Sequence, residues 1–297
     1  HLGNLRTYIF EDILAKTLRR AGFSVKHVMN ITDVGHLVSD ADDGEDKMLV
    51  AAKREGKTSR EVADFYTKVF FDDCGKLNIR RPDVVCNATS HIQEMIELIS
   101  TLEAKGFAYL SGGNVYFDVQ KFERYGALAK LSLDSLLSGA RVEVDSKKKH
   151  PADFALWFTS SKFDGQEMTW SSPWGVGYPG WHIECSAMAQ KHLGEQIDIH
   201  CGGIDHIPVH HTNEIAQSEA ASDKQFSKFW MHGNFLTTSS EKMSKSSGDF
   251  LTLDKVLARG INPLAYRYFC FSASYRKELA FSWEALESAA SGLKNLE

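Results

Sequence analysis

Apolar residues near the start of the chain repeat at helical spacing and then change to a short β-like run. A helix is predicted over residues 5–21, because Leu5, Ile9 and Ile13 fall on one of its faces. A strand is predicted at 25–31, and the polar quartet 30–33 stands at its carboxyl end. Doubly wound sheets bind their ligands beyond the carboxyl ends of parallel strands. The pattern is therefore typical of one β-α-β half of such a sheet, with its first strand expected upstream of residue 1.

Three more stretches have helical periodicity before the pattern changes. Helices are predicted over 47–54, 59–77 and 90–105, with Ser59 and Ser90 as their N-caps. The acidic residues that precede the first of these helices predict a surface loop.

After residue 106 the period of the hydrophobic pattern becomes two residues, as in a strand. A hairpin is predicted from strands at 107–110 and 114–117, joined by Ser-Gly-Gly. Alternation of helices and strands returns beyond Pro173, and the predicted elements are a helix, a strand, a helix and a strand at 180–193, 197–200, 208–221 and 229–236. Three further helices are predicted to start at Thr252, Pro263 and Ser282.

Composition places the chain among ordinary globular proteins. It has 297 residues, of which 43% are hydrophobic and 25% charged. No apolar run approaches the roughly 20 residues that span a bilayer, and no basic-then-apolar leader is present, so we expect a soluble protein. Five cysteines without a C-x-x-C pair fit reduced thiols in the cytoplasm better than a disulfide framework. Because the chain begins with His and its last helix has no stop signal, we expect a fragment of a longer protein.

Two segments far apart in the sequence have the character of phosphate-binding elements. At the start, Gly3 lets the backbone pass close to a ligand, and the helix that follows offers free N–H groups to an anion. Near the end, Lys242 and Lys245 lie three residues apart in a Ser- and Gly-rich stretch, where their ammonium groups can neutralise a polyphosphate. The alternatives are an ordinary helix cap and a solvated loop. Together the two segments predict one nucleotide site.

A third set of residues has the chemistry of a zinc site. Cys, His and Glu are ligand types that zinc accepts, and His210 and Glu214 share a helix face at i, i+4 spacing. Cys185 would complete a trio with a coordination position left open. His182 and His211 are alternative ligands, since each lies close to one of the three. The other interpretation is that Cys185 is a small buried residue and that the histidines are ordinary polar groups.

These motifs carry a resemblance to a known family. The segments 1–4 and 242–246 resemble the "HIGH" and "KMSKS" signatures of class I aminoacyl-tRNA synthetases, with Asn4 in place of the final His. The segments 180–188, 202–205 and 210–219 resemble the cysteinyl-tRNA synthetases within that class. The chain departs from the family pattern at Cys201, where Gly is usual, at 206–209, and in an insertion of unknown role at 35–46.

The resemblance implies a role for particular residues. It implies one Zn²⁺ ion held by Cys185, His210 and Glu214, with a fourth ligand, a Cys, upstream of residue 1. It implies a cysteine pocket at Thr32 and Trp181, in which the substrate thiolate also coordinates the ion. The implied ATP-binding residues are His1, Gly3, Asn4, Gly202, Gly203, Asp205, Lys242, Met243, Ser244 and Lys245. Those implied to act in catalysis are His1, Asn4, Lys242 and Lys245.

The resemblance also implies a fold and its division. We expect an α/β protein with the Rossmann-like parallel sheet of class I aminoacyl-tRNA synthetases, its first strand and C-terminal helical domains lying outside this chain. The expected parts are the first half of the sheet at 1–106, a connective insertion at 107–172, the second half with the zinc site at 173–238, and the lysine loop with the start of a helical fold at 239–297.

The implied activity is that of a cysteine–tRNA ligase. Cysteine would be activated with ATP and Mg²⁺ to cysteinyl-adenylate and then transferred to the 3′ end of tRNA(Cys), by a cytoplasmic monomer with no membrane partner. One rival is the cysteine ligase of mycothiol biosynthesis, and another is a noncatalytic paralogue that binds nucleotide or RNA. The net charge of −5 does not favour a generally basic RNA surface, and the basic run 147–150 is either a solvated face or a tRNA contact.

Overall fold

The structure is a computed structural model that describes residues 1–34, 56–133, 146–159, 168–238, 241–242 and 251–296. Its α-helices are α1 (Leu2–Arg20), α3 (Ser59–Lys76), α4 (Ile92–Ala104), α6 (Trp181–Leu193), α7 (Thr212–Ser222), α8 (Leu253–Ala258), α9 (Pro263–Cys270) and α10 (Trp283–Lys294). Its strands are β1 (Val28–Ile31), β2 (Val84–Asn87), β3 (Ala108–Ser111), β4 (Asn114–Phe117), β5 (Phe154–Phe158), β6 (Trp170–Ser172), β7 (Gly175–Pro179), β8 (Ile197–Gly203), β9 (Ser227–Gly233), β10 (Leu236–Thr238), β11 (Glu241–Lys242) and β12 (Leu279–Phe281).

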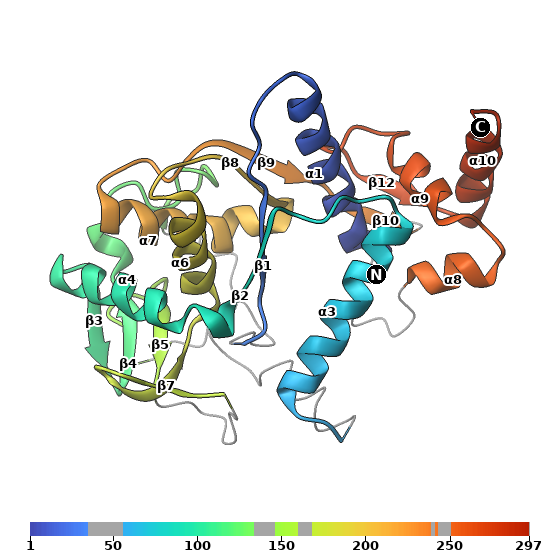
Figure 1. Cartoon of the computed structure of the whole chain (residues 1–297). Coiled ribbons are helices and arrows are strands. Elements are labelled where there is room, and N and C mark those ends of the chain that lie inside the picture. The colour runs from blue at the N-terminus through green and yellow to red at the C-terminus, as the bar shows by residue number, and fades with distance from the viewer. Residues whose placement is uncertain (35–55, 134–145, 160–167, 239–240, 243–250, 297) are drawn as a thin grey trace.

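Two pairs of parallel strands form the α/β part of the molecule (Figure 1). In one, β1 pairs with β2, and α3 lies in the connection between them. In the other, β8 pairs with β9, with α7 between them. A helical crossover of this kind is how parallel strands are joined, so the predicted Rossmann-like α/β class is confirmed. Within the described residues the two pairs are separate two-stranded sheets.

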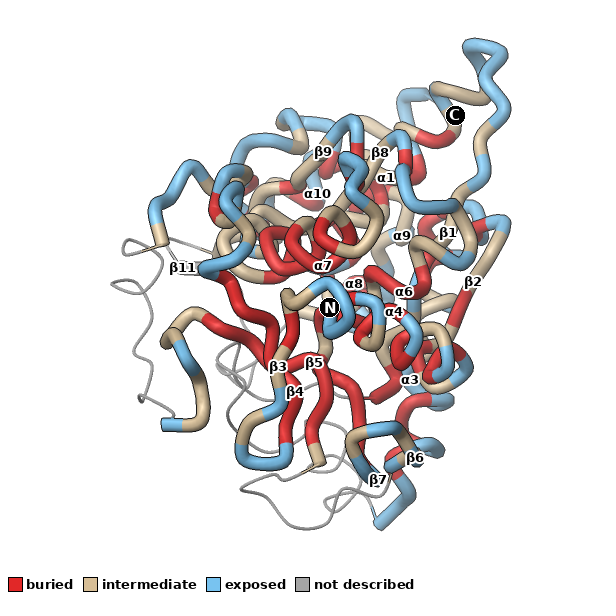
Figure 2. The backbone as a smooth tube through the Cα atoms, turned by 90° about the vertical axis from the view of Figure 1, so that its left-hand side faces the viewer, coloured by how far each residue is buried: buried red, intermediate tan, exposed pale blue. Residues whose placement is uncertain are grey.

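An antiparallel sheet has the strand order β3-β4-β5-β7-β6 and lies below α4 and α6 in the view of Figure 1. The predicted hairpin is confirmed as β3 and β4, in which Ala108 stands opposite Phe117. Every residue of β4 and β5 is buried, as the tube in Figure 2 shows. The sheet continues through β7, beyond residue 172, which is the predicted end of the connective insertion.

A second hydrophobic core joins the first helix to the end of the chain. Leu2, Leu5 and Ile9 of α1 pack with buried residues of α8, α9, α10, β10 and β12. The small sheet β11-β10-β12 lies against this core. The N-terminal turn is thus packed against the segments on either side of residues 243–250.

The helix starts predicted in this C-terminal part are confirmed. Thr252, Asn262 and Ser282 cap α8, α9 and α10, and each accepts a backbone N–H with its side-chain oxygen. Pro263 is the first residue of α9, where its missing N–H costs nothing.

Two predicted N-caps are wrong. Thr58, and not Ser59, caps α3, because the Thr58 hydroxyl accepts from Glu61 N while the Glu61 carboxylate accepts from Thr58 N. Ser90 lies in a 3₁₀ turn over Ala88–Ser90, and α4 begins at Ile92.

The strand predicted at 229–236 is two strands, and the helix predicted at 208–221 has an irregular start. Asn234 and Phe235 separate β9 from β10. Residues Ile207–His211 form a π-helix before α7 begins. The helix predicted at 47–54 and the acidic loop before it lie outside the described residues.

Candidate metal and nucleotide site

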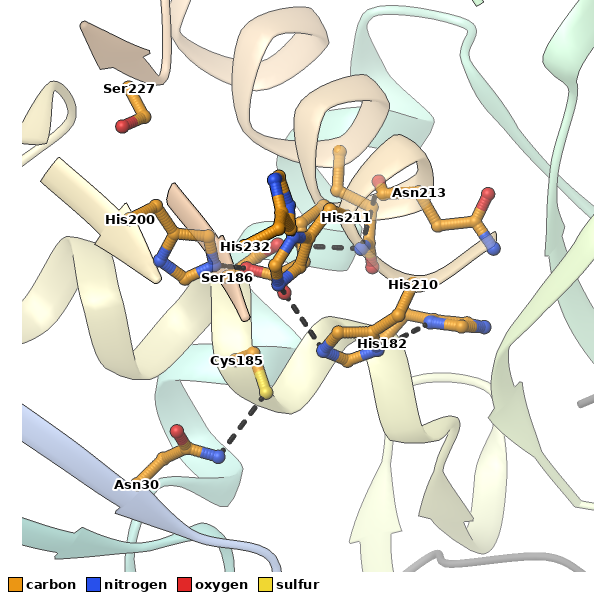
Figure 3. Close-up of polar contacts among 12 residues, drawn as sticks. Asn30, His182, Cys185, Ser186, His200, His210, His211, Asn213, Ser227 and His232 are labelled. Atoms are coloured by element: carbon orange, nitrogen blue, oxygen red, sulfur yellow. Dashed lines mark hydrogen bonds and ion pairs between the residues drawn. The ribbon is translucent and has the colours of Figure 1, made fainter. Parts of the chain in front are cut away.

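Cys185, His210 and Glu214 meet at one point between α6 and α7. One ligand atom of each lies within 4.8 Å of the others. Figure 3 shows Cys185 and His210 with the histidines around them. Cys185 lies on the second turn of α6, His210 lies in the π-helix, and Glu214 lies on the first turn of α7. Small side-chain movements would bring all three atoms onto an ion at zinc's bonding distances of about 2.0–2.3 Å. The trio predicted from the sequence is therefore brought together.

Two adjacent histidines at the end of the π-helix both approach the Glu214 carboxylate. His210 Nε2 lies 2.8 Å from Glu214 Oε1, and His211 Nε2 lies 4.0 Å from the same oxygen. Single π turns of this kind are frequent at functional sites.

Glu214 is enclosed by imidazoles. Its side chain is 1% exposed, and its second carboxylate oxygen lies 2.9 Å from His200 Nε2. Burial by itself raises the pKa of a carboxyl group, but His200 and His210 overcome that effect and hold the pKa of Glu214 well below its usual value. Neither carboxylate oxygen has a partner with hydrogen-bond geometry within the described chain. A buried carboxylate of this kind fits a cation held between it and its neighbours.

The Cys185 thiol also fits a metal ligand. Burial, and then the nearby Glu214, raise the pKa of this thiol well above its ordinary value, so the protein alone keeps it protonated. The one hydrogen bond drawn to its sulfur comes from Asn30 Nδ2, at 3.4 Å (Figure 3). Among divalent cations, zinc suits a donor set of thiolate, imidazole and carboxylate, and it deprotonates a coordinating thiol.

Five further histidines lie around the trio, namely His182, His200, His206, His211 and His232. His182 Nδ1 lies 3.0 Å from His210 Nδ1, and His211 Nδ1 lies 2.8 Å from His232 Nε2. Burial lowers the pKa of His182 and of His211 well below the ordinary value, and lowers that of His232 to about 4. The imidazoles of these three residues consequently favour the neutral form at pH 7. His200, His211 and Glu214 form a second close group next to the first.

His200 and His232 are the residues that the sequence did not indicate. They lie on adjacent parallel strands, where His200 stands opposite Trp230 and Gly202 stands opposite His232. A signal was present, because His200 and Gly202 share one face of β8 and Trp230 and His232 share one face of β9. This signal could have been recognised only with knowledge of the register between β8 and β9.

The two residues predicted to line a cysteine pocket flank the trio. The Trp181 ring stacks on the His210 ring, with centroids 4.3 Å apart and planes 17° apart. Thr32 follows β1, and its hydroxyl accepts a hydrogen bond from Asn30 Nδ2, the same amide that contacts Cys185. One predicted pocket residue therefore contacts a metal-site residue directly, and the other is linked to one through Asn30.

Gly202, Gly203 and Asp205 lie at the carboxyl end of β8, beside the histidines. A Cβ on Gly202 would come within 2.7 Å of His211 Cε1 and 2.9 Å of His206 Nδ1. Only glycine lets both rings pack against this part of the backbone. Burial, and then the nearby His210, lower the pKa of His206, so this ring also favours its neutral form.

The two signature segments are only partly described. α1 begins at Leu2, with His1 as its N-cap, and a Cβ on Gly3 would lie 3.1 Å from His1 Nδ1. Asn4 is exposed. The backbone of Lys242 lies in β11, whereas Met243, Ser244 and Lys245 lie outside the described residues. Leu2 N donates to Leu251 O at 2.8 Å, which joins the N-terminal turn to the segment that follows those residues.

A membrane-crossing helix is not found in the described ranges, because none of their helices is long and apolar enough.

Comparisons with known proteins identify the class of this fold. The family model of the class I (C) tRNA synthetase catalytic domain matches residues 1–291, and the chain belongs to that family. The fold is similar to that of methionyl-tRNA synthetase from Mycobacterium tuberculosis in complex with methionyl-adenylate, with a TM-score of 0.71 and 20% identity, over 97% of this chain and 64% of that one.

The similar curated proteins are more specific. The chain is 58% identical over 296 residues to the cysteine–tRNA ligase of Treponema denticola, covering 100% of this chain and 60% of that protein. It is 51% identical over 297 residues to cysteine–tRNA ligase 1 of Burkholderia lata, covering 100% of this chain and 63% of that protein. The chain thus spans about three fifths of the length of these relatives.

Proposed function

We propose that this chain is the catalytic region of a cysteine–tRNA ligase. The whole protein would activate cysteine with ATP to cysteinyl-adenylate and pyrophosphate, and then transfer the cysteinyl group to the 3′ end of tRNA(Cys). The observation that carries the proposal is the convergence of Cys185, His210 and Glu214 within 4.8 Å, beside the Trp181 ring. The identity with named cysteine–tRNA ligases supports the same assignment.

The residues around the trio would select the amino acid. Cys185, His210 and Glu214 would hold Zn²⁺, and a cysteine on a strand upstream of residue 1 would be the fourth protein ligand. Bound Zn²⁺ would supply a soft Lewis acid that prefers sulfur to oxygen and lowers the pKa of a thiol. Trp181 and Thr32 would enclose the cysteine substrate and exclude water from it. Because serine lacks a soft anion, no separate editing step is needed.

The nucleotide would lie between the carboxyl end of β8 and the start of α1. Gly202, Gly203 and Asp205 would bind adenine and ribose. His1, Gly3, Asn4 and the free N–H groups at the start of α1 would bind the phosphates. Lys242, Met243, Ser244 and Lys245 would close over the leaving pyrophosphate, with Mg²⁺ accompanying ATP. Lys242 and Lys245 would act by stabilising developing negative charge.

The reaction requires positioning and charge stabilisation, and no nucleophile from the protein. The cysteine carboxylate attacks the α-phosphorus of ATP, and pyrophosphate leaves. A ribose hydroxyl of the tRNA terminus then attacks the carbonyl carbon, and AMP leaves. Holding the reactants in line supplies most of the rate enhancement. We further propose that the whole protein acts as a cytoplasmic monomer.

Pyrophosphate exchange tests the proposal. The full-length protein is expected to exchange labelled pyrophosphate into ATP when cysteine is added, and much less when serine is added. Transfer of labelled cysteine to tRNA(Cys) is then compared with transfer to the amino sugar that the mycothiol ligase uses. Transfer to the sugar alone would favour that ligase, and ATP binding without any exchange would indicate a noncatalytic paralogue.

A further inference from the structure

A buried arginine on α1 binds four carbonyl groups from two distant segments. Arg6 is 4% exposed. Its Nη1 donates to Asn234 O at 2.7 Å and to Phe235 O at 2.6 Å, just before β10. Its Nη2 donates to Lys277 O at 2.6 Å and to Ser274 O at 3.3 Å, just before β12. One guanidinium therefore fixes the approach to β10 and to β12, two of the three strands of the small sheet, against α1.

The same helix is also hydrogen-bonded to the residues before α8 and to α9. Leu2 N donates to Leu251 O at 2.8 Å. Leu2 O in turn accepts from Tyr266 Oη of α9 at 2.6 Å, in a buried contact. The polypeptide is consequently anchored to α1 at two points, through Phe235 before β10 and through Leu251 before α8.

The geometry points to Arg6 as a positioning residue for the strand pair β10–β11, a role that rests on the proposed function. β10 pairs with β11, where Thr237 stands opposite Lys242, so the backbone of Lys242 pairs with the strand whose approach Arg6 secures. The helix that carries Arg6 also starts with the His1–Asn4 turn. Arg6 thereby holds the strand pair that ends at Lys242 against the helix that begins with this turn.

Only a guanidinium suits this position. Its planar fork directs several N–H groups at once, and here it donates to four carbonyls in two segments. Phe235 O and Ser274 O also accept from the backbone, whereas Asn234 O and Lys277 O depend more heavily on Arg6. A lysine ammonium carries three donors around one atom and cannot reach both segments along the same directions. The conservative change Arg6→Lys therefore keeps the charge but should loosen the anchor.

The test compares Arg6→Lys with Arg19→Lys in the full-length protein. Arg19 lies on the same helix but binds Val25 O and Asp83 instead of the segments before β10 and β12, so it is a matched control. Cysteine activation by Arg6→Lys is expected to slow roughly tenfold to a hundredfold, the size of effect that a remote misplacement has on catalysis. Transfer of cysteine from preformed adenylate to tRNA, KM for cysteine and zinc content should stay within about twofold, as should every property of Arg19→Lys. An equal loss in activation and transfer would indicate a merely structural role and overturn the inference.

A second variant and a second readout keep the test independent of activity. Tyr266→Phe removes one hydroxyl and should slow activation in the same direction but less. Hydrogen–deuterium exchange of the segment 234–242 should rise in Arg6→Lys while that of α6 and α7 does not change. If the wild type shows no cysteine-dependent exchange of pyrophosphate, the proposed function fails, and the hydrogen–deuterium result still decides the anchor. Unchanged protection of 234–242 in Arg6→Lys would refute it.

Discussion

Around Glu214 the chain buries a carboxylate among histidines. Around Leu2 and Tyr266 it instead buries apolar side chains together with a few arginines that form hydrogen bonds and an ion pair. In the first region burial lowers the pKa of several imidazoles, and a thiol is held protonated. In the second, hydrogen bonds from Arg6 and Arg267 join segments that are distant in sequence. The region around Glu214, which would hold zinc in our proposal, should therefore respond to chelators and to acid. The region around Leu2 and Tyr266 should respond to the loss of a buried hydrogen-bond or ion-pair partner.

The largest loss of stability is expected in the region around Leu2 and Tyr266. Asp12 and Arg267 form a buried ion pair of 2.6 Å between α1 and α9, with side chains 2% and 10% exposed. Replacing Arg267 by Met leaves the Asp12 carboxylate without this partner, and breaking such a pair costs about 3–5 kcal/mol. Urea denaturation of the full-length protein would measure the loss in the free energy of unfolding.

Two observations refine that prediction. Zinc bound per protein should not change in Arg267→Met, since Cys185, His210 and Glu214 are untouched. The double variant Asp12→Asn, Arg267→Met should recover part of the stability, because it removes a buried charge that has lost its partner on α9 and retains Lys16 Nζ and Arg80 N as partners. A destabilisation below about 1 kcal/mol would mean that the pair behaves like a surface salt bridge.

Loss of Cys185, a zinc ligand in our proposal, should have the next largest effect. In full-length Cys185→Ala, bound zinc should fall from one equivalent to almost none, and cysteine-dependent pyrophosphate exchange should fall by about a hundredfold or more. A hundredfold corresponds to about 2.7 kcal/mol. Metal analysis of the purified protein, together with exchange assays, measures both.

The control is Cys86→Ala, which removes a buried thiol from the neighbouring strand β2. This variant should keep its zinc. If Cys185→Ala also keeps a full equivalent, Cys185 is not a ligand, and the specificity argument is lost with it.

Acid should lower the free energy of unfolding through His232, in the region around Glu214. Its pKa is about 4 in the folded chain and about 6.5 when unfolded, so the unfolded chain takes up the proton first as the pH falls. The stabilisation is complete above pH 6.5 and is lost as the pH falls toward 4. With chelator present, His232→Gln should reduce the fall in unfolding free energy between pH 7 and pH 4 by about 1–2 kcal/mol, allowing for its partial exposure.

The wild-type protein provides the comparison. An identical slope in His232→Gln would show that the His211–His232 contact is not the source of the effect.

The smallest effect is expected far from both regions. Thr58→Ala removes the capping box of α3 and should lower the free energy of unfolding by about 1 kcal/mol. Zinc content and pyrophosphate exchange should not change. Thr101→Ala, which removes an exposed i−4 hydrogen bond within α4, should cost clearly less, and equal losses would argue against a special role for the cap.

Local patterns were enough to predict most elements of this fold. Caps at Thr252 and Ser282, the Ser-Gly-Gly hairpin and the i, i+4 pair His210 and Glu214 depend on residues that are close in sequence. Such signals need no knowledge of tertiary contacts. For the same reason the Ser59 cap was wrong by one residue, because Ser and the adjacent Thr58 are equivalent until Glu61 selects between them.

Features set by long-range packing were not predictable from the sequence. The π turn before α7, the break between β9 and β10 and the place of His200 all depend on partners far along the chain. Arg6 is the clearest case, since its four acceptors lie more than two hundred residues away. Backbone carbonyls carry no side-chain signature, and periodicity therefore gives no warning of such a contact.

Gly202 stands between the histidines and the nucleotide in our proposal. The imidazoles of His211 and His206 occupy the space that a Cβ of Gly202 would take. A ligand that shifts either ring would therefore act on a residue that borders the other ligand. Thermodynamic reciprocity then requires that cysteine alter the affinity for ATP by the same factor by which ATP alters the affinity for cysteine. A methyl group at this position would change both affinities together, so we expect the two substrates to be energetically linked.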